Sequence, residues 1–182
     1  IWVAPFWLAV GEPNKIEHKM YVERFLAAGF HVVGVDVGTS CGSPAGADVY
    51  QQAYEHLRRE HRLNEKTRLL GQSNGGLISY AWAFRHPESV DRIGCIYPAT
   101  DFRSWPGLAN VLSYPEPSLS YGLSLDELTR RAAEFNPIDN LAPLAKAGVK
   151  IFHIHGDKDE LVPADVNTVE LVKRYRKLGG EA

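Results

Sequence analysis

Strand-like and helix-like segments alternate along the whole chain, and few folds accommodate that order. Short apolar runs rich in β-branched residues predict strands at residues 1–5, 31–37, 68–70, 92–97 and 149–154. Helix patterns occupy most of the intervals, at residues 15–28, 50–62, 77–85, 124–136 and 165–178. Because a helical crossover joins parallel strands, this order predicts an α/β fold, a mostly parallel sheet with helices on both faces.

Local chemistry sets the bounds of one of these helices and of two irregular segments. Ser124 and Glu127 have the spacing of a capping box, which starts a helix, and Pro137 ends that helix because the residue before a proline avoids the α conformation. Residues 38–46 (GTSCGSPAG) predict a loop, since glycine, serine and proline dominate them. The irregular stretch 101–122 predicts a small lid or one wall of a substrate pocket.

Length and composition limit the classes of protein. The 182 residues suit one domain with a buried core, so we expect a single domain over residues 1–182. A net charge of −2 argues against a nucleic-acid partner, because nucleic-acid-binding proteins usually carry a clustered excess of basic residues. No apolar run reaches the ~18–20 residues of a membrane span. Cys41 and Cys95 form no disulfide framework or metal-binding spacing, and they leave the cellular compartment open.

The segment Gly71-Gln72-Ser73-Asn74-Gly75 places Gly-x-Ser-x-Gly between a short apolar strand and an amphipathic helix. In such a nucleophile elbow the backbones of strand and helix nearly touch, so a Cβ two residues before or after the serine would clash. Ser73 is therefore the candidate nucleophile at the carboxyl edge of the sheet. The N–H of Asn74, at the helix N-terminus, is a candidate donor to an oxyanion.

A second motif follows the strand predicted at residues 149–154. It reads His155-Gly156-x-x-Asp159-x-x-Val162-Pro163. This pattern resembles the acid loop of α/β-hydrolases, and most closely the branch of prolyl-oligopeptidase-like peptidases, dienelactone hydrolases and acetyl-xylan-type esterases. The resemblance extends over nearly the whole chain and implies that Asp159 is the acid of a Ser-Asp-His triad, with Asp157 as the alternative.

The same resemblance implies a second oxyanion donor on the loop after the first strand. Members of the family often have His-Gly there, whereas this chain has Ala4-Pro5. Because proline lacks an N–H, the donor falls to Phe6 or Trp7, and we favour Phe6. The alternative is that these aromatic side chains only pack beneath the loop.

The triad base is missing from the printed sequence. The family order is serine, acid, histidine, yet none of the seven histidines follows Asp159. The resemblance implies a further strand after Gly180, a loop with the histidine and a final helix. We therefore expect both ends of the sequence to lie inside a longer protein. Without an imidazole to take its proton, Ser73 is a poor nucleophile, and we expect this chain to be nearly inactive while its parent is an enzyme.

The family resemblance implies a serine hydrolase that needs no metal or organic cofactor. We expect esters of small acids or acylated sugars as substrates, since the chain offers no evident acidic site for a peptide amine. The alternatives are a prolyl-oligopeptidase-like peptidase and a non-catalytic binding module with the same fold. One wall of the substrate site is expected from Trp105, Tyr114 and Tyr121, although packing inside a lid explains these residues equally well.

One pattern indicates a different chemistry. His153-x-His155-x-Asp157 places two imidazoles on one face of a strand with a carboxylate just beyond, which resembles the metal site of metallo-β-lactamase-like hydrolases. That family continues with a histidine where this chain has Lys158. The better interpretation is that His155 holds the acid loop and His153 packs beside it. The sequence leaves the oligomeric state open.

Overall fold

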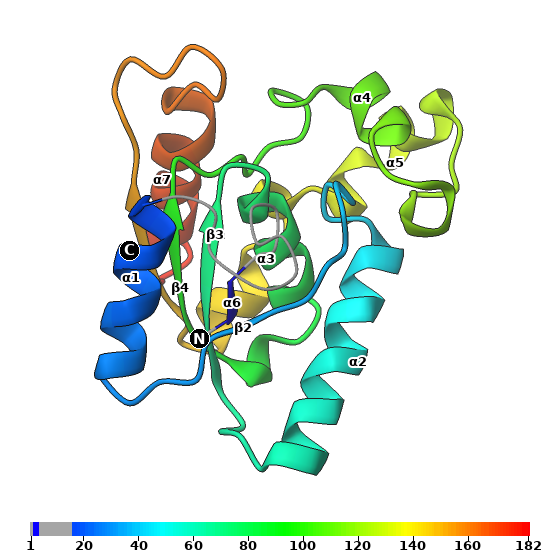
Figure 1. Ribbon diagram of the computed structural model, residues 1–182. Coiled ribbons are helices and arrows are strands. Elements are labelled where there is room, and N and C mark those ends of the chain that lie inside the picture. Colours follow the sequence, from blue (N-terminus) through cyan, green and yellow to red (C-terminus); the bar gives the residue numbers. More distant parts are fainter. Residues whose placement is uncertain (1, 4–15) are drawn as a thin grey trace.

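A parallel sheet of five strands forms the centre of the protein (Figure 1). The computed structural model describes residues 2–3 and 16–182. The strands lie in the order β2-β1-β3-β4-β5, and every neighbouring pair is parallel. They are β1 (Trp2–Val3), β2 (Val33–Gly34), β3 (Thr67–Gln72), β4 (Val90–Ile96) and β5 (Lys150–Ile154). The predicted parallel α/β architecture is thereby confirmed.

Helices cover both faces of this sheet. α1 lies on one face, opposite α3 and α6 (Figure 1). Within the described residues, the five longer helices are α1 (Ile16–Ala27), α2 (Pro44–His61), α3 (Gly75–Ala83), α5 (Leu125–Phe135) and α7 (Glu170–Lys177). Two short ones are α4 (Leu108–Ser113) and α6 (Ala142–Lys146). Among residues 2–3 and 16–182, no helix combines the length and the apolar character needed to cross a bilayer.

Two sequence predictions about loops were wrong in part. α2 begins at Pro44 and so includes the end of the segment predicted as a loop over residues 38–46. Ser43 accounts for the early start, because its Oγ accepts the N–H of Gly46 at 3.0 Å and Pro44 occupies the first turn, where no N–H is needed. The irregular stretch 101–122 contains α4, which is too short to leave a clear periodic pattern.

Two apolar clusters hold these layers together. The larger cluster joins the sheet to α2, α3, α6 and α7, and its biggest fully buried side chains include Trp82, Tyr50, Tyr80 and Tyr175. The smaller one lies at the carboxyl end of the sheet, where it joins the start of α3 to α4, α5 and the loop after β5 through Leu77, Val111, Leu128 and Val162. The segment 101–135 is therefore packed against the loops that carry the predicted site.

Candidate active site

Ser73 lies at the turn between β3 and α3 with a φ of 52°. This left-handed conformation costs a non-glycine residue about 1–2 kcal/mol, so the surrounding structure has to impose it. Three backbone hydrogen bonds do so. The Ser73 N–H donates to the Ile96 carbonyl at 3.1 Å, and the Ser73 carbonyl accepts the N–H of Gly76 at 2.9 Å and of Ala99 at 3.0 Å. The turn is thus tied to β4 and to the loop that follows β4.

Two glycines make this turn possible. A Cβ on Gly71 would lie 2.8 Å from the Gly75 carbonyl oxygen and 3.0 Å from Sγ of Cys95. A Cβ on Gly76 would lie 2.5 Å from the carbonyl oxygen of Ala99. The close approach of strand and helix expected at Gly71 is confirmed. Sequence reasoning missed Gly76, although the doubled glycine after Asn74 was a visible signal for it.

Asn74 follows Ser73 and immediately precedes α3. Its N–H belongs to the first amides of the helix, which have no acceptor within the helix itself. Its side chain is 1% exposed, and neither amide atom has a hydrogen-bond partner among the residues that the structure describes. The expected second oxyanion donor, Phe6 or Trp7, lies outside the described residues.

The acid loop fixes the direction of the Asp159 carboxylate. Oδ1 accepts the N–H of Leu161 at 3.0 Å and of Val162 at 2.9 Å, while Oδ2 lies 3.4 Å from Nε2 of His155. The Asp159 side chain remains 22% exposed. Asp157, the alternative acid, is exposed at the surface of the same loop. Because β3 and β5 are parallel, Ser73 and Asp159 both follow carboxyl ends of strands, two strands apart.

His155 is buried and contacts two residues of the acid loop, Asp159 and Val162. Its side chain is 3% exposed, and its Nε2 lies 2.8 Å from the Val162 carbonyl oxygen, which can only accept, so Nε2 carries a hydrogen. Its Nδ1 lies 2.8 Å from Oγ1 of Thr168. Sequence reasoning anticipated the role of His155 but not that of Thr168, which lies one turn before α7.

His153 packs beside His155. Its Nδ1 lies 3.1 Å from Oγ1 of Thr168, and its Nε2 lies 2.8 Å from the hydroxyl of Tyr80. Burial, reinforced by the nearby His155, lowers the pKa of His153 to about 4. All four ring nitrogens of the two histidines therefore have protein partners. This arrangement favours a structural role for the pair over the metal site that the His-x-His-x-Asp pattern raised.

The three aromatic residues expected in a substrate wall have different surroundings. Tyr121 is buried, donates its hydroxyl to the Cys41 carbonyl at 3.0 Å and packs edge-on against Phe102 and Phe135. Trp105 is partly buried against the smaller apolar cluster. Tyr114 is 49% exposed. Tyr121 is thus a core residue of this region, whereas Tyr114 is exposed to solvent.

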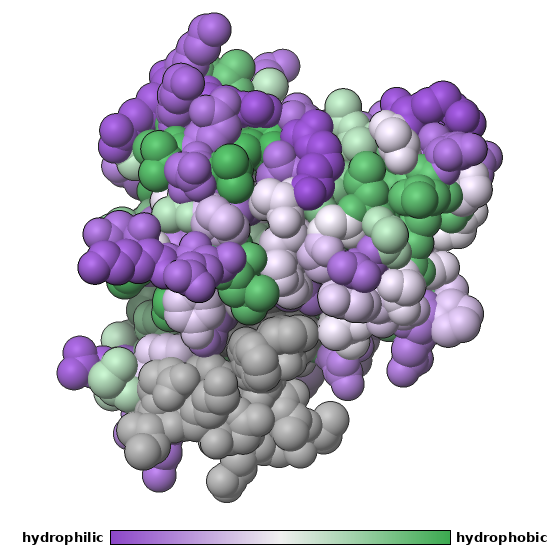
Figure 2. All heavy atoms as spheres, turned by 90° about the horizontal axis from the view of Figure 1, so that it is seen from above, coloured by the Kyte–Doolittle hydropathy of each residue, from purple (hydrophilic) through white to green (hydrophobic). Residues whose placement is uncertain are grey.

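Exposed apolar side chains border the predicted site. Figure 2 shows the face above the carboxyl ends of the strands, on which apolar side chains gather in two separate areas. Leu161, in the acid loop, is 69% exposed, and Val166 and Val169 just after the loop are also exposed. These side chains form an apolar surface next to Asp159 in the sequence.

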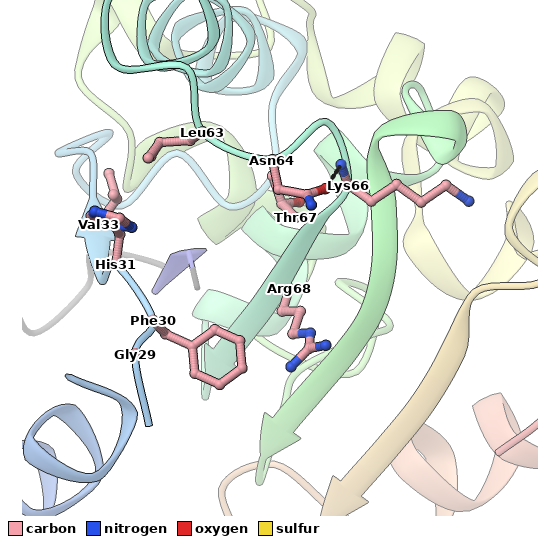
Figure 3. Close-up of a pocket in the computed structure, with 9 residues that line it drawn as sticks. All are labelled: Gly29, Phe30, His31, Val33, Leu63, Asn64, Lys66, Thr67 and Arg68. Atoms are coloured by element: carbon pink, nitrogen blue, oxygen red, sulfur yellow. Dashed lines mark hydrogen bonds between the residues drawn. The ribbon is translucent and has the colours of Figure 1, made fainter. Parts of the chain in front are cut away.

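A well-formed pocket of about 290 Å³ lies elsewhere (Figure 3). It is lined by residues near the amino ends of β2 and β3, among them Phe30, Val33, Thr67 and Arg68. Arg68 stacks over the Phe30 ring, 4.7 Å from its centroid, and pairs with Asp91 at 3.0 Å. Since Ser73 follows the opposite end of β3, this pocket is separate from the nucleophile turn.

Solved structures with the same architecture include several hydrolases. MPT51 of Mycobacterium tuberculosis matches 99% of this chain over 76% of its own, with a TM-score of 0.73 and 14% identity. A puromycin hydrolase matches 97% of this chain with a TM-score of 0.69 and 14% identity, and this chain spans only 28% of that protein. A serine hydrolase of Cycloclasticus zankles matches 95% of this chain over 76% of its own, with a TM-score of 0.51 and 17% identity. The sequence matches no protein-family model and no curated protein.

Proposed function

We propose that this chain, which has the α/β-hydrolase fold, is the major part of a serine hydrolase that cleaves carboxylic esters. The observation that carries the proposal is the conformation of Ser73, a non-glycine residue at φ 52° on a turn that Gly71 and Gly76 allow. Strained backbone of this kind clusters at active sites. The oriented carboxylate of Asp159 at the same edge of the sheet supports the assignment.

In the proposed mechanism, Ser73 Oγ attacks the ester carbonyl carbon and passes its proton to a histidine. The N–H of Asn74, together with that of Phe6 or Trp7, donates to the oxyanion of the tetrahedral intermediate. The C–O bond then breaks, and the leaving alcohol takes the proton from the histidine. Water, deprotonated by the same histidine, releases the acid and restores Ser73. No metal or organic cofactor takes part.

The histidine in this proposal comes from beyond Ala182. His153 and His155 are engaged with Tyr80, Thr168 and Val162, and they lie beneath the acid loop. The course of the chain supports a following strand, because the N–H of Ile151 donates to the Glu181 carbonyl at 3.0 Å. The backbone at residue 181 therefore runs beside β5, where the family resemblance expects the next strand to begin.

The proposed substrates are esters with an apolar or small acyl group. The exposed apolar side chains beside Asp159, led by Leu161, support this class. Peptide or amide cleavage is the alternative, since one structurally similar protein is described as a puromycin hydrolase. Assays with p-nitrophenyl acyl esters and with aminoacyl arylamides separate the two.

Intact-mass analysis after fluorophosphonate treatment tests the proposal. The reagent is applied to this chain and to a chain extended through the natural C-terminus, each with a Ser73→Ala control. We expect the extended chain to gain one adduct that Ser73→Ala abolishes, and the shorter chain to react far more slowly. No adduct on either chain would support the non-catalytic binding module instead.

A further inference from the structure

Asn167 connects two loops that are far apart in the sequence. It lies in the π-helical turn Asp165–Val169 that leads into α7, and its side chain is fully buried. Its Oδ1 accepts the N–H of Thr100 at 2.9 Å and of Asp101 at 3.1 Å. Its Nδ2 donates to the Pro163 carbonyl at 2.9 Å and to Oγ of Ser104 at 3.0 Å. The amide thus uses both acceptor positions and both donor hydrogens.

One end of this connection reaches the nucleophile. Thr100 follows Ala99, whose N–H donates to the Ser73 carbonyl at 3.0 Å. Two consecutive N–H groups held by Asn167 therefore anchor the loop that itself holds the Ser73 turn. A shift of this loop would move the peptide on which Ser73 depends for its conformation.

The other end reaches the acid. Pro163 follows Val162, whose N–H donates to Oδ1 of Asp159 at 2.9 Å and whose carbonyl lies 2.8 Å from Nε2 of His155. By donating to the Pro163 carbonyl, Asn167 fixes the position in space of the last residue of the acid loop. One buried amide therefore lies between the segment that shapes Ser73 and the segment that orients Asp159.

We propose that Asn167 is a positioning residue that fixes the acid loop relative to the nucleophile turn. The inference rests on the proposed serine-hydrolase function and names a residue which that function did not include. Catalysis in such a site depends on geometry, and a displacement of about 1 Å can cost on the order of 100-fold in rate. π-Helical turns, which insert one extra residue into a helix, also occur often at functional sites.

Asn136 provides a matched control. It is fully buried as well, and its Oδ1 accepts the N–H of Phe102 at 3.1 Å in the same loop after β4. Its Nδ2 donates to Oδ1 of Asp101 at 2.8 Å. Neither of these bonds involves the acid loop, so Asn136 shares the burial and chemistry of Asn167 without its link to Asp159.

The test is a double-mutant cycle in the extended chain, with ester turnover measured on protein that is shown to be folded. We expect Asn167→Ala to lower kcat about 10- to 100-fold with KM within about threefold. In an Asp159→Asn background the same change should lower kcat by a clearly smaller factor, because the part of the effect that passes through Asp159 is already lost. Asn136→Ala, which touches the loop after β4 but not the acid loop, should change kcat by the same factor with Asp159 present and in the Asp159→Asn background.

Asn167→Asp is the second variant, for the case in which Asn167→Ala does not fold. It keeps an oxygen for the N–H groups of Thr100 and Asp101 and loses the donor to Pro163 and to Ser104, and we expect the same non-additive loss of kcat. An equal loss in the presence and absence of Asp159, or no loss from either variant, overturns the positioning role alone. A parent chain with neither turnover nor a Ser73 adduct overturns the proposed function, and the positioning role with it.

Discussion

Oδ2 of Asp159 lies 3.4 Å from Nε2 of His155, while Oδ1 of the same carboxylate accepts two backbone N–H groups from its own loop. Oδ1 therefore helps to fix the shape of the loop, whereas Oδ2 takes no part in these backbone hydrogen bonds. In a Ser-Asp-His triad the acid needs such a division, because one oxygen must be free to accept from the histidine and hold its tautomer.

Asp159→Asn should lower turnover of the extended chain by about 10⁴-fold, since an amide stabilises the wrong imidazole tautomer. Asp157→Asn is the control, because Asp157 is exposed in the same loop. We expect it to retain turnover within about threefold. Steady-state kinetics with a p-nitrophenyl ester measures both. The reverse pattern would make Asp157 the triad acid.

His155→Ala should weaken both stability and turnover. The change removes the partner of the Val162 carbonyl and one partner of Thr168, and a buried polar group left without a partner costs about 1–3 kcal/mol. Urea unfolding at pH 7.5 measures the free energy of unfolding. The control is His56→Ala, at an exposed position on α2, which should change that free energy by at most about 0.5 kcal/mol. Equal changes in the free energy of unfolding for both variants would contradict the stabilising role of His155 in the acid loop.

The parts of this fold that the sequence predicted are those encoded by local patterns. The parallel α/β order follows from alternating segments, and the turn at Ser73 follows from glycines within a few residues of it. The capping box of Ser124 and Glu127 was also visible, and both of its hydrogen bonds form. In each case the residues that decide the structure are neighbours in the chain.

The features that the sequence did not reveal depend on distant residues. Asn167 binds the N–H of Thr100, which lies 67 positions earlier, so no short window contains the pair. Tyr121 looked like a candidate for a substrate wall because an aromatic residue in a loop has the same local pattern whether it is buried or open. Its burial depends on Phe102, Phe135 and the Cys41 carbonyl, which tertiary packing brings together.

Gly76→Ala should destabilise the protein by several kcal/mol, because the added Cβ would lie 2.5 Å from the Ala99 carbonyl oxygen, and backbone on both sides would have to move. Gly156→Ala is the matched control, since a Cβ there meets no atom within 4 Å. The control should be neutral or stabilising by up to about 1 kcal/mol, through the lower entropy of the unfolded chain. Thermal unfolding compares them, and similar melting temperatures for the two variants would contradict the tight turn.

His153 should make folding stability depend on pH on the acid side of neutrality. Burial lowers the pKa of His153 from 6.5 to about 4, so the folded state holds it neutral where the unfolded chain takes up a proton. The unfolded state therefore binds more protons between about pH 6.5 and pH 4, and stability falls as the pH is lowered through that window. The loss from this one group approaches about 3 kcal/mol and is complete below pH 4.

Urea unfolding of the parent and of His153→Gln, measured from pH 7.5 to pH 4, isolates this contribution. Glutamine offers polar groups to Tyr80 and Thr168 but does not titrate, so the variant should be less stable at pH 7.5 and lose less stability on acidification. The difference between the two curves should shrink as the pH falls below 6.5. Curves that stay parallel down to pH 4 would show that His153 takes up its proton at the same pH in the folded and unfolded states, and would contradict the lowered pKa.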